Sequence, residues 1–214
     1  IFSDLQLLGG EEGPTLEIVV SRARFVASQL ERSVRVIGLA TSLANAKDVG
    51  DWIGASSQSV FNFAPDVRPV PLEIQILTYD ANHASTRLLA MAKPAYGAIT
   101  KQSSGKPALI FVPSRKQAQL TAIDMVAFAA AGGDPNKFIG GGHAETLESV
   151  AASLYDKTVA QTLQMGVGFL YAGMPPTDRT KVEGLFSEGI IQILVVPHTI
   201  CWSLRASAHM VVIM

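Results

Sequence analysis

Short apolar runs alternate with helix-forming segments along the second part of the chain, and this alternation constrains the fold more than any other feature. The runs are ALIFV (108–112), VGFLY (167–171) and IQILVV (191–196). Helices are predicted to begin at Ser114, over ETLESVAASLYD and DKTVAQTL, and after Thr177 with a stop at Gly189. Uncharged strands separated by helices are typical of a parallel sheet, so the sequence predicts an α/β fold.

The first part of the chain follows a similar plan. An opening strand ends at IFSD, a helix runs from Pro14 to about Arg32, and VRVIGLA (34–40) is predicted to be a buried strand. A further helix, AKDVGDWI, has Asn45 as its N-cap and Gly54 as a left-handed stop. The strands ending at Phe2 and Ala40 are therefore expected to lie parallel in a sheet of their own.

A proline-rich stretch divides the two parts. FNFAPDVRPVPL (61–72) carries three prolines, which exclude a helix or a central strand. A strand is expected over EIQILTY (73–79), followed by a helix from Asn82 to about Ile99. The predicted organisation is a first lobe over 1–66, a linker over 67–78 and a second lobe over 79–214.

Composition narrows the possible classes of protein. The 214 residues are 48% hydrophobic and only 16% charged, with a mean hydropathy of +0.28 and a net charge of −1. No apolar stretch approaches the roughly 18 residues of a membrane span, so no membrane contact is expected. The near-zero charge predicts little attraction to polyanions. Cys201 is the single cysteine, which excludes an intrachain disulfide and fits a reducing compartment.

Isolated short motifs carry little chemistry. Gly105-Lys106 lacks the following Ser/Thr and precedes a strand, so it does not match a phosphate-binding loop. The run from Gly140 to His143 could approach a phosphate, but a flexible loop is the favoured interpretation. No metal site is predicted, since no metal-ligand spacing relates Cys201 to the histidines His83, His143, His198 and His209.

Longer stretches carry a family resemblance. SLANAKDVGDWIG, RPVPLEIQI, MAKPAYGAI, FVPSRKQAQLTAIDM, VGFLYAGMPPTDRTKVEGLFSEGIIQILVV and PHTICWSLRASAHMVVI occur in this order. Together they resemble the superfamily-two DExH-box RNA helicases with tandem cassettes, and in particular the second, C-terminal cassette of the spliceosomal members. The resemblance covers nearly the whole chain. It implies two partial RecA-like lobes with parallel sheets, truncated at both ends, the second reaching the motif V region.

The resemblance also indicates where catalytic groups should lie. Active members carry Asp-Glu-x-His at the end of the opening strand, where the acids hold Mg²⁺ and activate water. The matching positions here include Ser3, Asp4 and Gln6, so only one carboxylate remains. Asp4 is either the remnant of an acid pair or a strand-end residue that caps a turn, and the second interpretation is favoured.

Other motifs of the resemblance are altered as well. The Ser-Ala-Thr motif, which couples hydrolysis to lobe movement, is matched by Ala40, Thr41 and Ser42. In the last motif, positions that contact RNA phosphate and line the nucleotide pocket are matched by Pro197, Ser203 and Arg205. Contact with RNA is expected to be weak or absent, and the loop with Ser114 and Arg115 is the candidate for any that survives.

These changes predict a catalytically silent cassette with a regulatory and architectural role. The resemblance implies membership of a nuclear spliceosomal RNA helicase that unwinds U4/U6 RNA. Expected partners are other spliceosomal proteins, including an active cassette in the same chain and a large scaffold protein of the U5 particle. An active ATP-dependent RNA helicase and an unrelated α/β nucleotide-binding enzyme remain alternatives, although no GxGxxG follows a strand.

The ligands ATP and Mg²⁺ belong to the parent family, and none is expected to bind to this segment alone. The phosphate-binding loop of the family would lie before Ile1, and its arginine-rich motif would lie after Met214. The segment by itself is therefore expected neither to hydrolyse ATP nor to fold independently.

Overall fold

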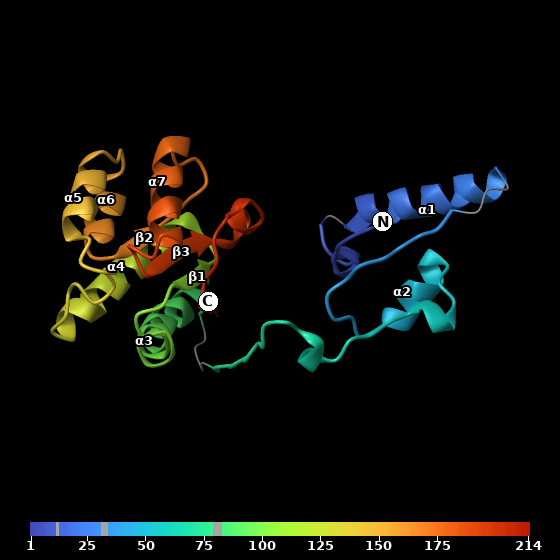
Figure 1. Cartoon of the computed structure of the whole chain (residues 1–214), viewed down its shortest axis with the longest axis horizontal. Helices are drawn as coiled ribbons and strands as arrows, with labels where there is room; N and C mark the ends of the chain where they lie inside the picture. Colours follow the sequence, from blue (N-terminus) through green and yellow to red (C-terminus); the bar gives the residue numbers. More distant parts are fainter. Residues whose placement is uncertain (12, 31–33, 79–82) are drawn as a thin grey trace. The chain divides into compact units, whose positions relative to one another are not determined.

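A computed structural model describes residues 1–11, 13–30, 34–78 and 83–214 (Figure 1). The chain divides into two compact units, Ile1–Ile76 and Leu77–Met214. In the described parts, no helix is both long and apolar enough to cross a bilayer. The assignment of the two units to parts of two RecA-like lobes, with the boundaries given above, stays a prediction.

The second unit is built on a four-stranded parallel sheet. Its strands are β1 (Ala108–Val112), β2 (Val167–Phe169), β3 (Ile193–Pro197) and β4 (Met210–Ile213), in the order β2-β3-β1-β4. Every pairing is parallel, and β1 lies between β3 and β4 in the sheet. The predicted α/β fold with a parallel sheet is confirmed. It is consistent with a partial RecA-like lobe.

Helices connect these strands and lie on either side of them. In Figure 1, α7 is above the strands and α3 below them. The predicted helices are confirmed, and Gly189 takes a left-handed φ of 74° just after α7. The helices of this unit are α3 (Ala84–Gln102), α4 (Arg115–Ala131), α5 (Ala144–Ala152), α6 (Lys157–Gln164) and α7 (Pro176–Ser187).

The two central strands explain the high hydropathy of this part of the chain. All five residues of β3 are buried, as are four of the five residues of β1. Helix α4 packs against this layer through Ala118, Ala122 and Met125, all fully buried. Small residues on α4 let the helix approach the sheet closely, while β4 at the edge buries only alternate side chains in part.

One glycine of the Gly140–His143 run has a packing role. A Cβ on Gly140 would lie 1.9 Å from the backbone oxygen of Gly189, and the Gly140 N–H donates to the oxygen of Ile190 at 2.8 Å. Close contact between two backbone segments therefore accounts for glycine at this position.

The first unit consists mainly of helices. Its elements are α1 (Gly13–Gln29), α2 (Ala46–Ile53) and the 3₁₀ turns η1 (Leu5–Leu7), η2 (Ser57–Ser59) and η3 (Pro65–Val67). The predicted helix start at Pro14 and the stop at Gly54, with φ of 86°, are confirmed. Asn45 is at the N-cap position of α2, but its side chain makes no capping hydrogen bond.

The two strands predicted for the first unit are wrong as full strands. The structure has one parallel bridge between Phe2 and Gly38, with the Phe2 N–H donating to the oxygen of Ile37 at 2.8 Å. Val34 and Leu39 are exposed, so the β-branched run has no sheet face to pack against. Strand propensity depends on such neighbours, and without them the pairing ends after one bridge.

The strand predicted over EIQILTY is also wrong in its described part. Residues 73–78 carry no regular secondary structure, and Ile74 and Ile76 are exposed. Tyr79, and the predicted helix start at Asn82, lie outside the described residues. Pro65 opens η3, and the rest of the proline-rich stretch carries no regular structure.

Candidate functional site

The position matching the first acidic motif is a tight turn. Asp4 adopts left-handed backbone angles, with φ of 61° and ψ of 37°, and is the only described non-glycine residue with positive φ. It precedes η1, but its side chain caps no backbone N–H of that turn. Its Oδ1 instead accepts a hydrogen bond at 3.1 Å from Nε2 of Gln6. The structure therefore does not show the side-chain cap that was favoured for Asp4.

Gln6 joins this turn to the second altered motif. Its Oε1 accepts a hydrogen bond from the Thr41 N–H at 3.1 Å, while the same carboxamide donates to Asp4. The structure thus brings together Asp4, Gln6 and Thr41, whose motifs are 35 residues apart. Thr41 and Ser42 are exposed, as are Ser3 and Ala40.

The donor set at this turn does not fit the magnesium site that the resemblance implies. Mg²⁺ in phosphoryl-transfer enzymes is held by carboxylates. Ser3 offers only a hydroxyl, and the single carboxylate of Asp4 already accepts a hydrogen bond from Gln6. Among the described residues, no three His, Cys, Asp or Glu side chains form a group suited to a metal ion.

In the second unit, the positions matching the last motif follow β3. Pro197 ends β3 and is buried in register with Val112. The 3₁₀ turn η4 (His198–Ser203) follows. Arg179 of α7 donates from Nη2 to the backbone oxygen and to Oγ of Ser203, at 2.8 and 3.0 Å, so Ser203 is bound within the fold. Arg205 is exposed.

The loop after β1 holds the candidate RNA-facing residues. Ser114 caps α4 through its Oγ, which accepts from the Gln117 N–H at 3.2 Å, and α4 begins directly after it, where a helix start was predicted. The Cζ of Arg115 lies 3.8 Å from the ring centroid of Tyr171, in a cation–π contact. The Tyr171 hydroxyl donates to Oδ2 of Asp156 at 3.1 Å.

Tyr171 and Asp156 were not recognised from the sequence as neighbours of Arg115. Asp156 also accepts the N–H groups of Thr158 and Val159 and so caps α6, a role that an Asp before a helical segment could have indicated. Burial, together with the hydrogen bond to Asp156, raises the pKa of Tyr171. Nothing in the sequence pattern indicates that Tyr171 lies under Arg115.

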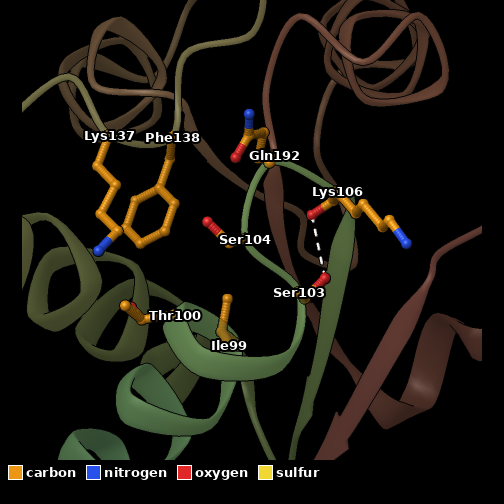
Figure 2. Close-up of a pocket in the computed structure, with 9 residues that line it drawn as sticks. Ile99, Thr100, Ser103, Ser104, Lys106, Lys137, Phe138 and Gln192 are labelled. Atoms are coloured by element: carbon orange, nitrogen blue, oxygen red, sulfur yellow. Dashed lines mark hydrogen bonds between the residues drawn. The ribbon is translucent and has the colours of Figure 1, made fainter.

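A small pocket lies at the opposite end of the sheet. Figure 2 shows Ser104 and Lys106 on the loop before β1, and Lys137, Phe138 and Gln192 also line the pocket. The side chain of Lys106 is directed away from these residues. This loop includes Gly105-Lys106 and follows the end of α3 instead of opening a helix. The geometry of a phosphate-binding loop, which needs a strand before it and a helix after it, is therefore absent from this loop.

The class of protein follows from sequence comparisons considered with this parallel α/β fold: the chain is related over its whole length to the DExH-box RNA helicases. It is 47% identical over 216 residues to the U5 small nuclear ribonucleoprotein 200 kDa helicase of Homo sapiens. It is 45% identical to the DExH-box ATP-dependent RNA helicase DExH14 of Arabidopsis thaliana, and 42% identical to activating signal cointegrator 1 complex subunit 3 of Homo sapiens, each over 213 residues. Each alignment covers all of this chain but 10% of the relative, and no protein-family model matches the chain.

The comparisons confirm the predicted relation to the DExH-box helicases and to the U5 helicase. The chain spans about a tenth of the length of these relatives. The similarity therefore does not by itself assign the activity or the partners of a whole helicase to this chain.

Proposed function

We propose that the chain is part of a degenerate, ATPase-inactive cassette of a nuclear spliceosomal RNA helicase. In this role the cassette binds proteins and regulates an active cassette in the same polypeptide, while the parent protein unwinds U4/U6 RNA during pre-mRNA splicing. Its proposed partners are the active cassette, the large U5 scaffold protein and other spliceosomal proteins.

The state of Asp4 carries this proposal. Hydrolysis needs one acid to hold Mg²⁺ and another to orient the attacking water. The only carboxylate at the motif is on a left-handed turn, accepts a hydrogen bond from Gln6 and is one methylene shorter than glutamate. A misplacement of about 1 Å at a reacting group can reduce the rate on the order of a hundredfold.

The second unit supports the proposal independently. Pro197 has neither a side-chain hydroxyl nor a backbone N–H for a phosphate, and Ser203 is bound to Arg179 within the fold. Restoring the acid pair alone would therefore leave these positions unsuited to ATP-driven RNA binding.

Exposed apolar side chains on α1 favour a role in protein contact. Ile18, Val19, Phe25 and Val26 are all at least half exposed. Large apolar patches are typical of protein-contacting surfaces, so these side chains fit contact with another part of the parent protein or with a partner.

The test is a steady-state ATPase assay, with and without RNA, on the intact cassette that contains this chain. The unmodified cassette and its Ser3→Asp, Asp4→Glu double variant are both expected to lack appreciable turnover. Turnover near about 1 s⁻¹ in the unmodified cassette would support the alternative of an active RNA helicase, which the relation to named ATP-dependent helicases favours. Turnover gained only by the double variant would confine the loss to the acid pair.

A further inference from the structure

A groove in the first unit is lined by residues of η1, α1 and α2 and of the segments next to them. The lining residues are Leu8, Glu17, Asn45, Asp48, Val49 and Trp52. Four of them follow the spacing i, i+3, i+4 and i+7 from Asn45, so they share one face of α2. The motif residues Asp4, Gln6 and Thr41 are not among the six. A ligand in this groove would therefore be distinct from any nucleotide at the motif positions.

The size of the groove limits what it can hold. It is open to solvent and has a volume of about 270 Å³. Sites that enclose a whole small molecule have volumes of roughly 300–1,000 Å³, so this groove is better suited to one long side chain presented by another polypeptide. Leu8, Val49 and Trp52 are each partly exposed. They supply apolar surface along which the methylenes of such a side chain can lie.

Two uncompensated carboxylates give the groove a negative charge. Glu17 and Asp48 are exposed, and neither carboxylate makes a hydrogen bond or an ion pair with another described residue. Arg24 lies seven residues after Glu17, on the same face of α1, but its Nη1 donates to the backbone oxygen of Trp52. The cation on this face of α1 is therefore already engaged at the end of α2, and the groove is complementary to a positive charge from outside the unit.

An aromatic side chain together with two carboxylates suits a guanidinium better than an ammonium. A planar guanidinium can lie on an indole ring, and its five N–H donors can serve two carboxylates at once. We propose that this groove docks one arginine side chain of a partner polypeptide. The guanidinium binds Glu17, Asp48 and Trp52, and the methylenes contact Leu8 and Val49. This inference deepens the proposed role of the cassette in binding proteins, and it rests on that role.

The first test uses the intact cassette that contains this chain, labelled with 5-fluorotryptophan, and two blocked tripeptides as probes. One probe is leucine–arginine–leucine, and the other has citrulline, the neutral isostere of arginine, at the central position. The fluorine resonance of Trp52 is assigned from its loss in Trp52→Phe. It should shift with the arginine peptide, with a dissociation constant on the order of 1 mM, and should not shift with the citrulline peptide.

The second test compares charge-neutralised variants of the same protein. Glu17→Gln and Asp48→Asn should each weaken binding of the arginine peptide about fivefold, because each removes one carboxylate from an exposed ion pair. Asp51→Asn is the matched control, since it removes the same charge from α2 at an exposed position outside the groove. Its effect should be less than about twofold. Unchanged circular dichroism spectra would show that all three variants fold.

Several outcomes would overturn the proposal. Equal shifts with the citrulline peptide, or a loss in Asp51→Asn as large as that in Glu17→Gln, would exclude recognition of a charge by this groove. Tighter binding of the corresponding lysine peptide would exclude selection of a guanidinium. A Trp52 resonance that changes with protein concentration but not with either peptide would show that a second copy of the chain occupies the groove.

These measurements can fail without the proposed function failing. None of them measures ATP turnover, so the absence of peptide binding would leave the proposed silent cassette standing. Turnover in the ATPase assay would contradict the silent cassette and leave the docking groove standing.

Discussion

The side chain of Gln6 bonds at one end to the carboxylate of Asp4 and at the other to the backbone N–H of Thr41, each at 3.1 Å. Segments far apart in the sequence are thereby fixed to each other by one carboxamide, which can donate and accept at once. A histidine at this position in active relatives is implied by the resemblance. The amide at this position does not itself titrate, unlike a histidine.

Two substitutions of Gln6 should distinguish the effect of its hydrogen bond to Asp4 from that of its hydrogen bond to Thr41. Gln6→Ala loses both hydrogen bonds, whereas Gln6→Glu keeps an acceptor for the Thr41 N–H but places a like charge beside Asp4. Amide hydrogen exchange at Thr41 should accelerate in the alanine variant and change little in the glutamate variant. The loss of local stability should be about 0.5–1 kcal/mol, at the low end because the pair is exposed. Gln58→Ala on η2 is the control, and equal acceleration there would contradict the prediction.

Tyr171→Phe should change how stability depends on pH. Burial and the hydrogen bond to Asp156 raise the pKa of the Tyr171 phenol above its ordinary value of 10.0. The folded state therefore retains this proton more strongly, and the resulting stabilisation is complete below pH 10.0 and is lost as the pH rises through the raised pKa. In chemical denaturation between about pH 8 and pH 12, the free energy of unfolding should fall more steeply with pH for the unmodified protein than for Tyr171→Phe.

Tyr155→Phe provides the matched control for this pH series. Tyr155 is largely exposed and its hydroxyl has no partner among the described residues, so its removal should leave the pH dependence unchanged. If the fall of unfolding free energy with pH persisted in Tyr171→Phe but disappeared in Tyr155→Phe, it could not be assigned to the Tyr171 hydroxyl.

Asp124→Asn should be slightly stabilising at neutral pH. Burial raises the pKa of this half-buried carboxyl, so its charged form is disfavoured in the folded protein. The unmodified protein should therefore gain stability relative to the variant as the pH falls through the raised pKa toward 3.8. At pH 7, the free energy of unfolding of Asp124→Asn, measured by urea denaturation, should exceed that of the unmodified protein by no more than about 0.5 kcal/mol. Asp134→Asn, at an exposed position, should show no such pH-dependent difference.

Two glycines should respond oppositely to alanine. Gly140→Ala puts a Cβ 1.9 Å from the oxygen of Gly189, so backbone must move, and a loss of about 3 kcal/mol or more in unfolding free energy is expected. Gly184 is inside α7 with open space around its Cβ position. Gly184→Ala should therefore stabilise the protein by about 0.5–1 kcal/mol. Thermal unfolding distinguishes the two, and equal effects would contradict the packing argument.

The second unit was predictable because its signals are local. ALIFV is β1 residue for residue, and α4 begins directly after Ser114, where a helix start was predicted, since periodicity and capping depend on nearby residues. The run 34–40 has the same β-branched composition, yet it forms only one bridge at Gly38. Strand formation there depends on partners that local sequence does not specify.

The contacts at the motif positions were less predictable. The resemblance indicated Asp4 and Gln6, but their hydrogen bond depends on the left-handed turn at Asp4, which few non-glycine residues adopt. The contact between Arg115 and Tyr171 joins residues that follow different strands. Such contacts follow from the assembled sheet and leave no periodic trace in the sequence.

Strand β4 has a practical consequence for handling this segment. It is at the edge of the sheet, and Val211 and Ile213 are 53% and 80% exposed on its outer face. Unpaired edges with apolar side chains recruit further strands from other molecules. A recombinant fragment limited to these residues should therefore be prone to precipitation through strand addition, and a charged residue at position 213 should improve its yield in soluble form.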